Sequence, residues 1–197
     1  KPPEGRMKAI AGNLVKWAKR ILLALVLLIL ASQAWYLGWV VWWKYSDPDM
    51  TRFMSIRLDE ARQKNPKAEL KHRWQPYEKI SSHLKRAVIA AEDDKFVDHE
   101  GFDWEGMQKA LEKNQKKGKV VAGGSTISQQ LAKNLFLSPA KTPLRKAQEA
   151  VITLMLETVW DKQRILEVYL NSVEWGECIF GAEAAARRYY NVSAGQL

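Results

Sequence analysis

The chain has 197 residues, of which 47% are hydrophobic and 27% charged, so its composition excludes a disordered protein and its length predicts one domain with a sizeable core. A single cysteine, Cys178, excludes an intrachain disulfide framework and a cysteine-rich zinc site, and three histidines without HxxxH spacing argue against a histidine metal centre. More than half of the formal net charge of +9 lies before residue 21, which leaves the remainder too weakly basic for a nucleic-acid-binding protein.

The first predicted element is a membrane-spanning helix over residues 21–43. This segment carries no charged side chain, and at ~1.5 Å per residue it is about 35 Å long, enough to cross the hydrocarbon core. Aromatic residues gather at its C-terminal end, and basic residues precede it: Lys16, Lys19 and Arg20. The positive-inside rule therefore predicts a cytoplasmic N-terminus, residues 1–20, with everything after Lys44 outside the cytoplasm. A cleaved signal peptide is the alternative, but the run is long and is followed by bulky tryptophans instead of a small-residue cleavage site.

Residues 44–80 predict a membrane-proximal linker with short helical pieces, because Pro48, Pro66 and Pro76 interrupt the segment. Four apolar residues form a cluster in this linker: Met50, Phe53, Met54 and Ile56. The cluster either packs against the domain or contacts the bilayer surface.

The sequence beyond residue 80 predicts a mainly α-helical domain over residues 81–197. Apolar residues recur every three or four positions in segments that begin near Leu84, Trp104, Ile127, Leu144 and Ile165. Asp103 stands where a helix N-cap is expected, and so do Ser125 and Thr126 before the segment at Ile127. No convincing alternating strand pattern is present.

Residues 92–104, EDDKFVDHEGFDW, are the first stretch suited to chemistry. Carboxylates beside aromatic and apolar neighbours can acquire raised pKa values, which general acid–base catalysis near neutral pH requires. On composition alone, a solvated helix end followed by an acidic loop is the simpler interpretation.

Two further stretches have similar alternatives. In residues 123–134, GGSTISQQLAKN, the glycines allow close backbone approach to a ligand, and the helix that follows offers free N–H groups to an anion. A glycine turn before a capped helix explains the same pattern. Arg145 and Glu149, four residues apart, either form a surface ion pair or bring a second carboxylate and cations into one cleft with Glu92.

Five blocks in chain order together resemble the peptidoglycan glycosyltransferases, glycosyltransferase family 51. The blocks are EDxxFxxHxG from Glu92, GGSTxxQQ from Gly123, RKxxE from Arg145, KxxILExYLN from Lys162 and GAEAAARRYY from Gly181. The resemblance implies a lysozyme-like helical domain on the periplasmic face of the bacterial inner membrane, which polymerises lipid II into glycan strands. Because the family's domain usually continues beyond the last block, we expect the C-terminal end to be truncated at Leu197.

The resemblance also implies roles for individual residues. Glu92 would be the general base that deprotonates the 4-hydroxyl of the acceptor sugar, which attacks the donor's anomeric carbon with inversion and releases undecaprenyl pyrophosphate. Glu149 would be the second catalytic carboxylate, orienting the cations or holding a divalent metal, Mg²⁺ or Mn²⁺. The implied substrate-binding residues are Lys133, Arg145, Lys146, Ser125, Thr126, Gln129, Gln130 and Asn134, with Lys141 and Lys162 as further cations. The residues implied to shape the loop beside Glu92 are Asp93, Phe96, His99 and Gly101, and we expect His99 to be a buried imidazole bracing that loop.

The implied partners are lipid II, the nascent glycan linked to undecaprenyl pyrophosphate, the membrane and other cell-wall synthesis proteins, with no nucleic acid and no organic cofactor. Inhibition by moenomycin is a further implication. Two other hypotheses are a lytic, lysozyme-like enzyme, for which the cations at Lys133, Arg145 and Lys146 would have no purpose, and a membrane-anchored scaffold that keeps the fold without the activity.

Overall fold

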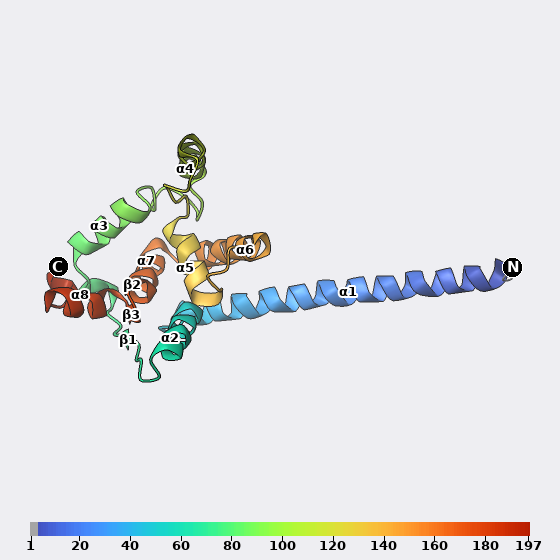
Figure 1. The fold of residues 1–197 in the computed structure, drawn as a ribbon, viewed down its shortest axis with the longest axis horizontal. Coiled ribbons are helices and arrows are strands. Elements are labelled where there is room, and N and C mark those ends of the chain that lie inside the picture. Colours follow the sequence, from blue (N-terminus) through green and yellow to red (C-terminus); the bar gives the residue numbers. More distant parts are fainter. Residues whose placement is uncertain (1–3) are drawn as a thin grey trace. The chain divides into compact units, whose positions relative to one another are not determined.

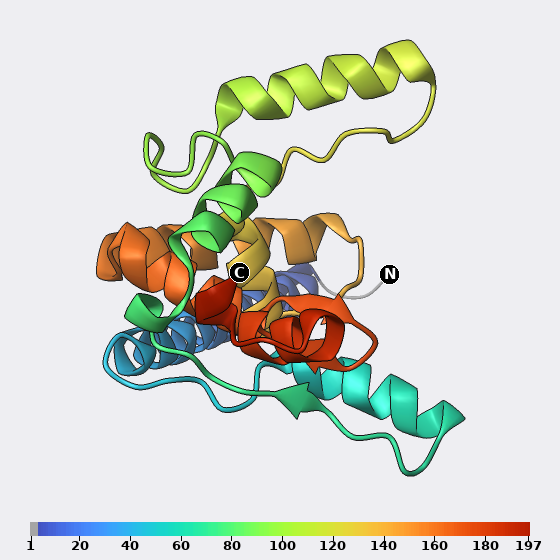
Figure 2. The same ribbon diagram turned by 90° about the vertical axis from the view of Figure 1, so that its left-hand side faces the viewer.

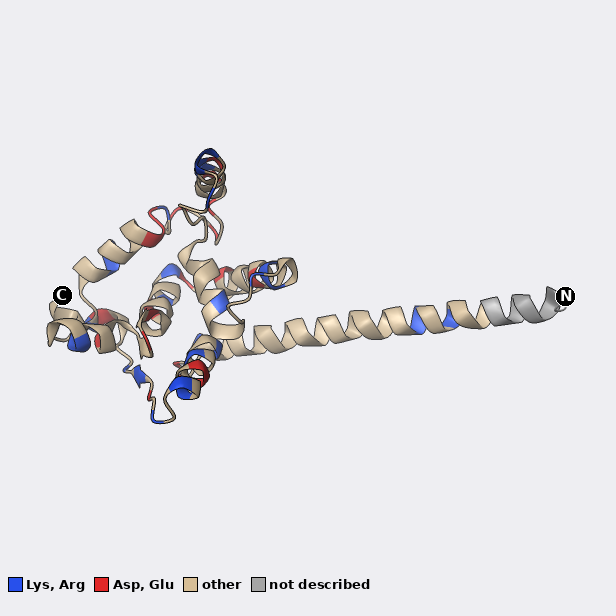
Figure 3. Cartoon of the chain, viewed as in Figure 1, with Lys and Arg blue, Asp and Glu red and all other residues tan. Residues whose placement is uncertain are grey.

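The computed structural model describes residues 4–197, with side chains from Gly12 onward, and divides into two units at Trp39. The first unit is most of helix α1 (Glu4–Trp43), the long helix whose C-terminal part, beyond its last basic residue, is tan in Figure 3. Residues 12–43 are the one segment in the described chain that is long and apolar enough to cross a membrane, and none of its apolar window is buried. Near the end of this unit the Trp35 ring lies 5.1 Å from Tyr36 and 6.3 Å from Trp39, an aromatic group of the kind that occupies membrane interfaces.

The second unit, Val40–Leu197, is mainly α-helical, as predicted (Figures 1 and 2). Its helices are α2 (Arg52–Lys64), α3 (Ser82–Glu92), α4 (Trp104–Lys117), α5 (Ile127–Phe136), α6 (Pro143–Val159), α7 (Lys162–Ser172) and α8 (Ala182–Tyr190), with 3-10 turns at Tyr77–Lys79 and Ala194–Gln196.

Helix α5 is the centre of this unit, packed by α2, α6 and α7. Its residues Ile127 and Leu131 are fully buried, and so are Ile152 and Leu156 of α6 and Ile165 of α7. The same i, i+4 spacing that predicted helices produces these apolar stripes, because residues four apart share a helix face. A helix buried on this scale positions whatever polar groups stand at its N-terminus.

The expected N-caps are present. The Asp103 side chain accepts from Gly106 N at 3.0 Å and starts α4, and Thr126 Oγ1 accepts from Gln129 N at 3.2 Å and starts α5. Each bond satisfies a backbone N–H that has no partner inside its helix. These local signals therefore predicted where the helices beside the site begin.

Residues 44–80, the predicted membrane-proximal segment, belong to the same compact unit as residues 81–197. Thr51 caps α2, and α2 buries Met54, Leu58 and Ala61. The apolar cluster at residues 50–56 is divided. Met54 is fully buried and the Phe53 ring lies 6.3 Å from Phe180, whereas Met50 remains about half exposed.

A small three-stranded sheet was not predicted. Strand β1 (Lys71–His72) pairs in parallel with β3 (Ile179–Phe180), which pairs antiparallel with β2 (Glu174–Gly176). Strands this short carry no periodic signal, so the pairing depends on tertiary structure. After β3 the chain turns at Gly181 (φ +81°), where a Cβ would lie 2.7 Å from the Asn171 carbonyl oxygen.

Candidate active site

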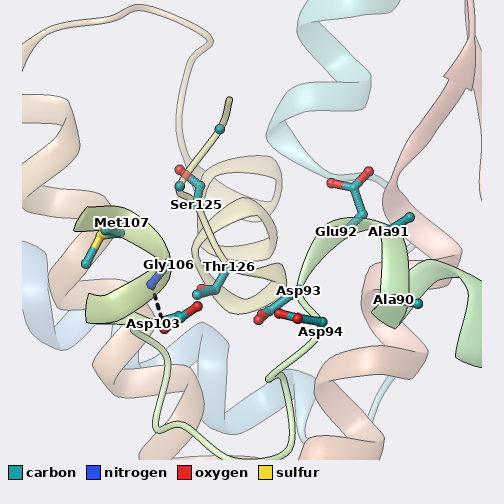
Figure 4. Close-up of a pocket in the computed structure, with 12 residues that line it drawn as sticks. Ala90, Ala91, Glu92, Asp93, Asp94, Asp103, Gly106, Met107, Ser125 and Thr126 are labelled. Carbon is teal, nitrogen blue, oxygen red and sulfur yellow. Dashed lines mark hydrogen bonds between the residues drawn. The ribbon is translucent and has the colours of Figure 1, made fainter. Parts of the chain in front are cut away.

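The predicted chemical residues meet around a cleft beside the end of α3. A hollow of about 180 Å³ lies between the end of α3, the first turn of α4 and the glycine-rich segment 123–126, and Figure 4 shows residues that line it. Glu92 and Ser125 stand on opposite sides of it. Glu92 also lines a second, more apolar hollow of about 340 Å³, together with Tyr169 and Trp175. Glu92 thus borders two open spaces, where a reacting group could approach it.

Glu92 is the last residue of α3, and its side chain is exposed. The Gln130 side-chain N–H donates to Glu92 Oε2 at 2.9 Å. Among the described residues this is the one recorded hydrogen bond to the Glu92 carboxylate, so the other oxygen is available to a ligand.

The next residue, Asp93, is buried and ties α3 to α5. Its Oδ2 accepts from the backbone N–H of Ile127 at 2.9 Å, and its Oδ1 lies 2.9 Å from His99 Nε2. The Gly101 backbone N–H donates to His99 Nδ1 at 3.0 Å. Since a backbone N–H can only donate, Nδ1 accepts and His99 Nε2 carries the proton that Asp93 binds. The buried imidazole thereby braces the loop that follows Glu92.

The same loop is fixed by packing. Phe96 is buried and its ring lies 6.4 Å from that of His99. Gly101 adopts φ +93°, and a Cβ there would come within 2.8 Å of Thr153 Cγ2, so both the backbone angle and the space require glycine. The Gly101 carbonyl accepts from Thr126 Oγ1 at 2.7 Å, which joins the loop to the start of α5.

Glu149 forms a buried, cation-bound carboxylate that is linked to the cleft wall through Lys146 and Ser125. It is only 2% exposed on α6. Arg145 Nη1 donates to one of its oxygens at 2.5 Å, and Lys146 Nζ donates to the other. Lys133 on α5 feels the charge of all three groups, and burial lowers the pKa of its ammonium below the ordinary value. Two cations therefore bind the Glu149 carboxylate and a third lies near enough to interact with it, so the group carries more positive than negative side chains.

Ser125 links the two sides. Its hydroxyl oxygen accepts from Lys146 Nζ at 3.2 Å, while its carbonyl lies 3.5 Å from the Gln130 side-chain nitrogen that binds Glu92. A ligand that contacts Ser125 would reach both the lone carboxylate and the cationic group.

Two buried side-chain atoms in the described part of the chain have no hydrogen-bond partner, Asn134 Oδ1 and Arg145 Nε. Both belong to residues predicted for the site. Because buried polar atoms are normally paired, an unpaired donor and acceptor are consistent with groups that a ligand completes.

Several predicted binding residues have structural contacts instead. Gln129 is buried, and its Oε1 accepts from the Thr126 backbone N–H at 3.0 Å in a capping box with the Thr126 hydroxyl, so both side chains take part in the start of α5. Lys162 donates to Glu157 at 2.8 Å and to the His99 carbonyl, away from Glu149. Lys141 lies in the exposed loop between α5 and α6.

Tyr169 belongs with the site although the sequence suggested only an apolar helix face. Its ring is buried on α7, and its hydroxyl donates to Gln130 Oε1 at 3.1 Å. The signal was present, since the tyrosine lies in the ILExYLN block, but its partner could not be read from spacing.

The residues at Glu149 do not fit a resident divalent metal. Both carboxylate oxygens are occupied by cationic donors. Over the residues that the structure describes, no group of three His, Cys, Asp or Glu side chains could hold a metal ion. Arg145 and Lys146 already supply the positive charge at this carboxylate.

Comparison with known proteins gives a consistent result. The family model described as Transglycosylase matches residues 59–197. A biosynthetic peptidoglycan transglycosylase of Dechloromonas aromatica (strain RCB) is 68% identical over 182 residues, 92% of this chain and 79% of that relative. The protein with the same name in Aromatoleum aromaticum is 64% identical over 183 residues, 93% of this chain and 80% of the relative. That of Nitrosospira multiformis is 59% identical over 182 residues, 92% of this chain and 79% of the relative.

Proposed function

The chain belongs to the transglycosylase family, and from that premise we propose that it polymerises lipid II into peptidoglycan glycan strands by inverting β-1,4 transfer, releasing undecaprenyl pyrophosphate. Family membership makes it a glycosyltransferase of cell-wall synthesis. The observation that carries the detailed proposal is the pair of unlike carboxylates that Ser125 links: Glu92 is exposed with one hydrogen-bond donor, and Glu149 is buried between two cations.

On the acceptor side, Glu92 is the general base. Its carboxylate borders both hollows, so the 4-hydroxyl of an acceptor sugar can approach the oxygen that Gln130 does not bind. Glu92 takes the hydroxyl proton as the acceptor oxygen bonds to the donor's anomeric carbon and the bond to the diphosphate breaks. A positioned base of this kind typically contributes ~10²–10⁴-fold to the rate.

On the donor side, the cationic group receives the diphosphate. The leaving diphosphate gains negative charge as its bond to the sugar breaks. Preorganised cations stabilise that charge, so no general acid is needed. Arg145 and Lys146 are held in place by Glu149, so they do not need to reorganise during the reaction. Lys133, half-buried, contributes the third charge. A glycan-cleaving enzyme would have no use for such a group, which favours the transferase.

The apolar helix α1 anchors the domain beside its substrates. Both substrates carry long lipids, so tethering raises their effective concentration at the cleft. The basic residues before the span place the N-terminus in the cytoplasm and the domain in the periplasm, in this proposal.

The test is polymerisation of labelled lipid II by the detergent-solubilised protein, beside Glu92→Gln. The expected result is a lysozyme-sensitive polymer from the wild type only, suppressed by moenomycin. Polymer from both proteins would remove Glu92 as the base. No polymer from the wild type, together with diphosphate binding, would favour a scaffold.

A further inference from the structure

A chain of two hydrogen bonds runs from the interior to Glu92 across three helices. Tyr169 on α7 donates to Gln130 Oε1 on α5 at 3.1 Å, and Gln130 Nε2 donates to Glu92 on α3 at 2.9 Å. These residues are far apart in sequence, so only the packing of α3, α5 and α7 brings them into line.

Both hydrogen bonds have only one consistent donor-to-acceptor direction, from Tyr169 toward Glu92. An ionised carboxylate can only accept, so the Gln130 NH₂ group must face Glu92. The amide oxygen of Gln130 is then left facing the Tyr169 hydroxyl, which must donate. If the Gln130 amide were turned the other way, its oxygen would face the Glu92 carboxylate. Two acceptors would then lie next to each other with no proton between them.

The inner end of the chain is rigid. Tyr169 is 2% exposed and belongs to the buried residues of α7. Burial, with the nearby charges of Glu92 and Asp93, raises the pKa of the Tyr169 hydroxyl, so this group stays protonated and remains a donor. The outer end lacks such packing, because Glu92 is exposed on the last turn of α3.

Gln130 has a competing arrangement. Its side-chain nitrogen already lies 3.5 Å from the Ser125 carbonyl, an alternative acceptor on the cleft wall. An amide that lost its inner hydrogen bond could rotate toward this carbonyl and release Glu92. The Tyr169 hydroxyl is the contact that opposes this rotation.

We propose that Tyr169 is a positioning residue for the transfer reaction, which holds Gln130 in the orientation that keeps the Glu92 carboxylate aligned for proton abstraction. The inference rests on the proposed role of Glu92 as general base. Tyr169 is proposed to affect the alignment of Glu92 and not the binding of either substrate. Loss of its hydroxyl should therefore lower kcat and leave KM nearly unchanged.

The first experiment compares Tyr169→Phe with the wild type in lipid II polymerisation. Phenylalanine keeps the buried ring and removes one hydrogen bond, so we expect kcat to fall roughly five- to tenfold with KM nearly unchanged. Tyr77→Phe is the matched control. Its ring lies under Lys85, its hydroxyl is not in the chain, and its kcat should stay at the wild-type value. Equal kcat for Tyr169→Phe and wild type would overturn the proposal.

A double-mutant cycle separates positioning from a general loss of structure. If Tyr169 acts through Gln130, Tyr169→Phe should change kcat little in a Gln130→Ala background. Full additivity of the two kcat losses would contradict the proposed route.

A third measurement does not depend on activity. The side-chain NH₂ signals of Gln130 in a ¹⁵N NMR spectrum can be assigned by their loss in Gln130→Ala. They should shift in Tyr169→Phe and stay in place in Tyr77→Phe. Unmoved signals would overturn the proposal even if the wild type polymerises lipid II, and moved signals would support the contact even if Glu92 proved not to be the base.

Discussion

The two carboxylates of the site have opposite environments. Glu92 is exposed and accepts one hydrogen bond from a neutral amide. Glu149 is 2% exposed and is bound by an arginine and a lysine on its own helix. One carboxylate oxygen of Glu92 is therefore open to a ligand, whereas both oxygens of Glu149 are engaged by cations. In the proposed reaction the Glu92 side moves a proton and the Glu149 side holds charge.

The largest expected effect separates activity from stability at Glu92. We expect Glu92→Gln to lower the polymerisation rate by at least ~100-fold, because the amide cannot accept the hydroxyl proton. The melting temperature should stay within a degree or so, since the side chain is exposed. Rates come from a gel assay with labelled lipid II, and melting from circular dichroism. A large fall in melting temperature would show that Glu92, like Glu149, is needed for stability, and would contradict this prediction.

Glu149→Gln, unlike Glu92→Gln, should lower the stability of the fold. It leaves Arg145, whose side chain is 15% exposed, beside Lys146 without the anion between them, so we expect a loss of about 3 kcal/mol of unfolding free energy. Glu60→Gln is the matched control, an exposed carboxylate paired with Arg57 three residues away, and should cost roughly 0.5 kcal/mol or less. Both are measured by urea unfolding in detergent. If Glu149→Gln and Glu60→Gln lost the same free energy of unfolding, burial of the Glu149 ion pairs would add nothing to stability.

The charge-holding side should depend on alkaline pH through Lys133. Burial lowers the pKa of this ammonium below its usual 10.5, so its charge is lost earlier as pH rises. The charged form binds a diphosphate, and we therefore expect affinity to fall as pH rises toward the lowered pKa. Lys133→Arg should retain affinity to higher pH, because arginine stays protonated. Calorimetry with inorganic pyrophosphate measures both, and identical pH profiles would remove Lys133 from the diphosphate site.

The smallest effect is expected at the bridge between the two sides. Ser125→Ala removes the oxygen that accepts from Lys146, a contact with an exposed lysine, so we expect pyrophosphate affinity to fall about threefold or less. The same calorimetry detects it. A loss as large as that of Lys146→Ala would mean that Ser125 is the main holder of the lysine.

Local signals predicted much of this arrangement. Helix starts at Asp103 and Thr126 follow from capping chemistry, and the buried stripe of α5 follows from its spacing. Short helical pieces were predicted within residues 44–80, but the bounds of α2 were not, although Thr51 and the spacing of Met54, Leu58 and Ala61 are themselves helix signals.

The distinction between the two adjacent glutamines was also missed. Thr126 and Gln129 fit the S/T-x-x-Q pattern of a capping box, which assigns Gln129 to the helix start. Gln130, one residue further, points to Glu92. By contrast, the partners Tyr169–Gln130 and Ser125–Lys146 could not be predicted from local pattern, because they depend on how separate helices pack.

The last turn of α1 has its own consequence for the order of folding. The indole N–H of Trp160 donates to the Val40 carbonyl at 2.7 Å, and Arg164 donates to the carbonyls of Trp43 at 2.8 Å and Ser46 at 2.6 Å. Helix ends leave carbonyls unsatisfied, and these two side chains bind carbonyls in the last turn of α1 and just beyond it. They enter the chain more than a hundred residues later. These contacts at the end of the apolar helix can therefore form only after the residues at the junction of α6 and α7 have been synthesised.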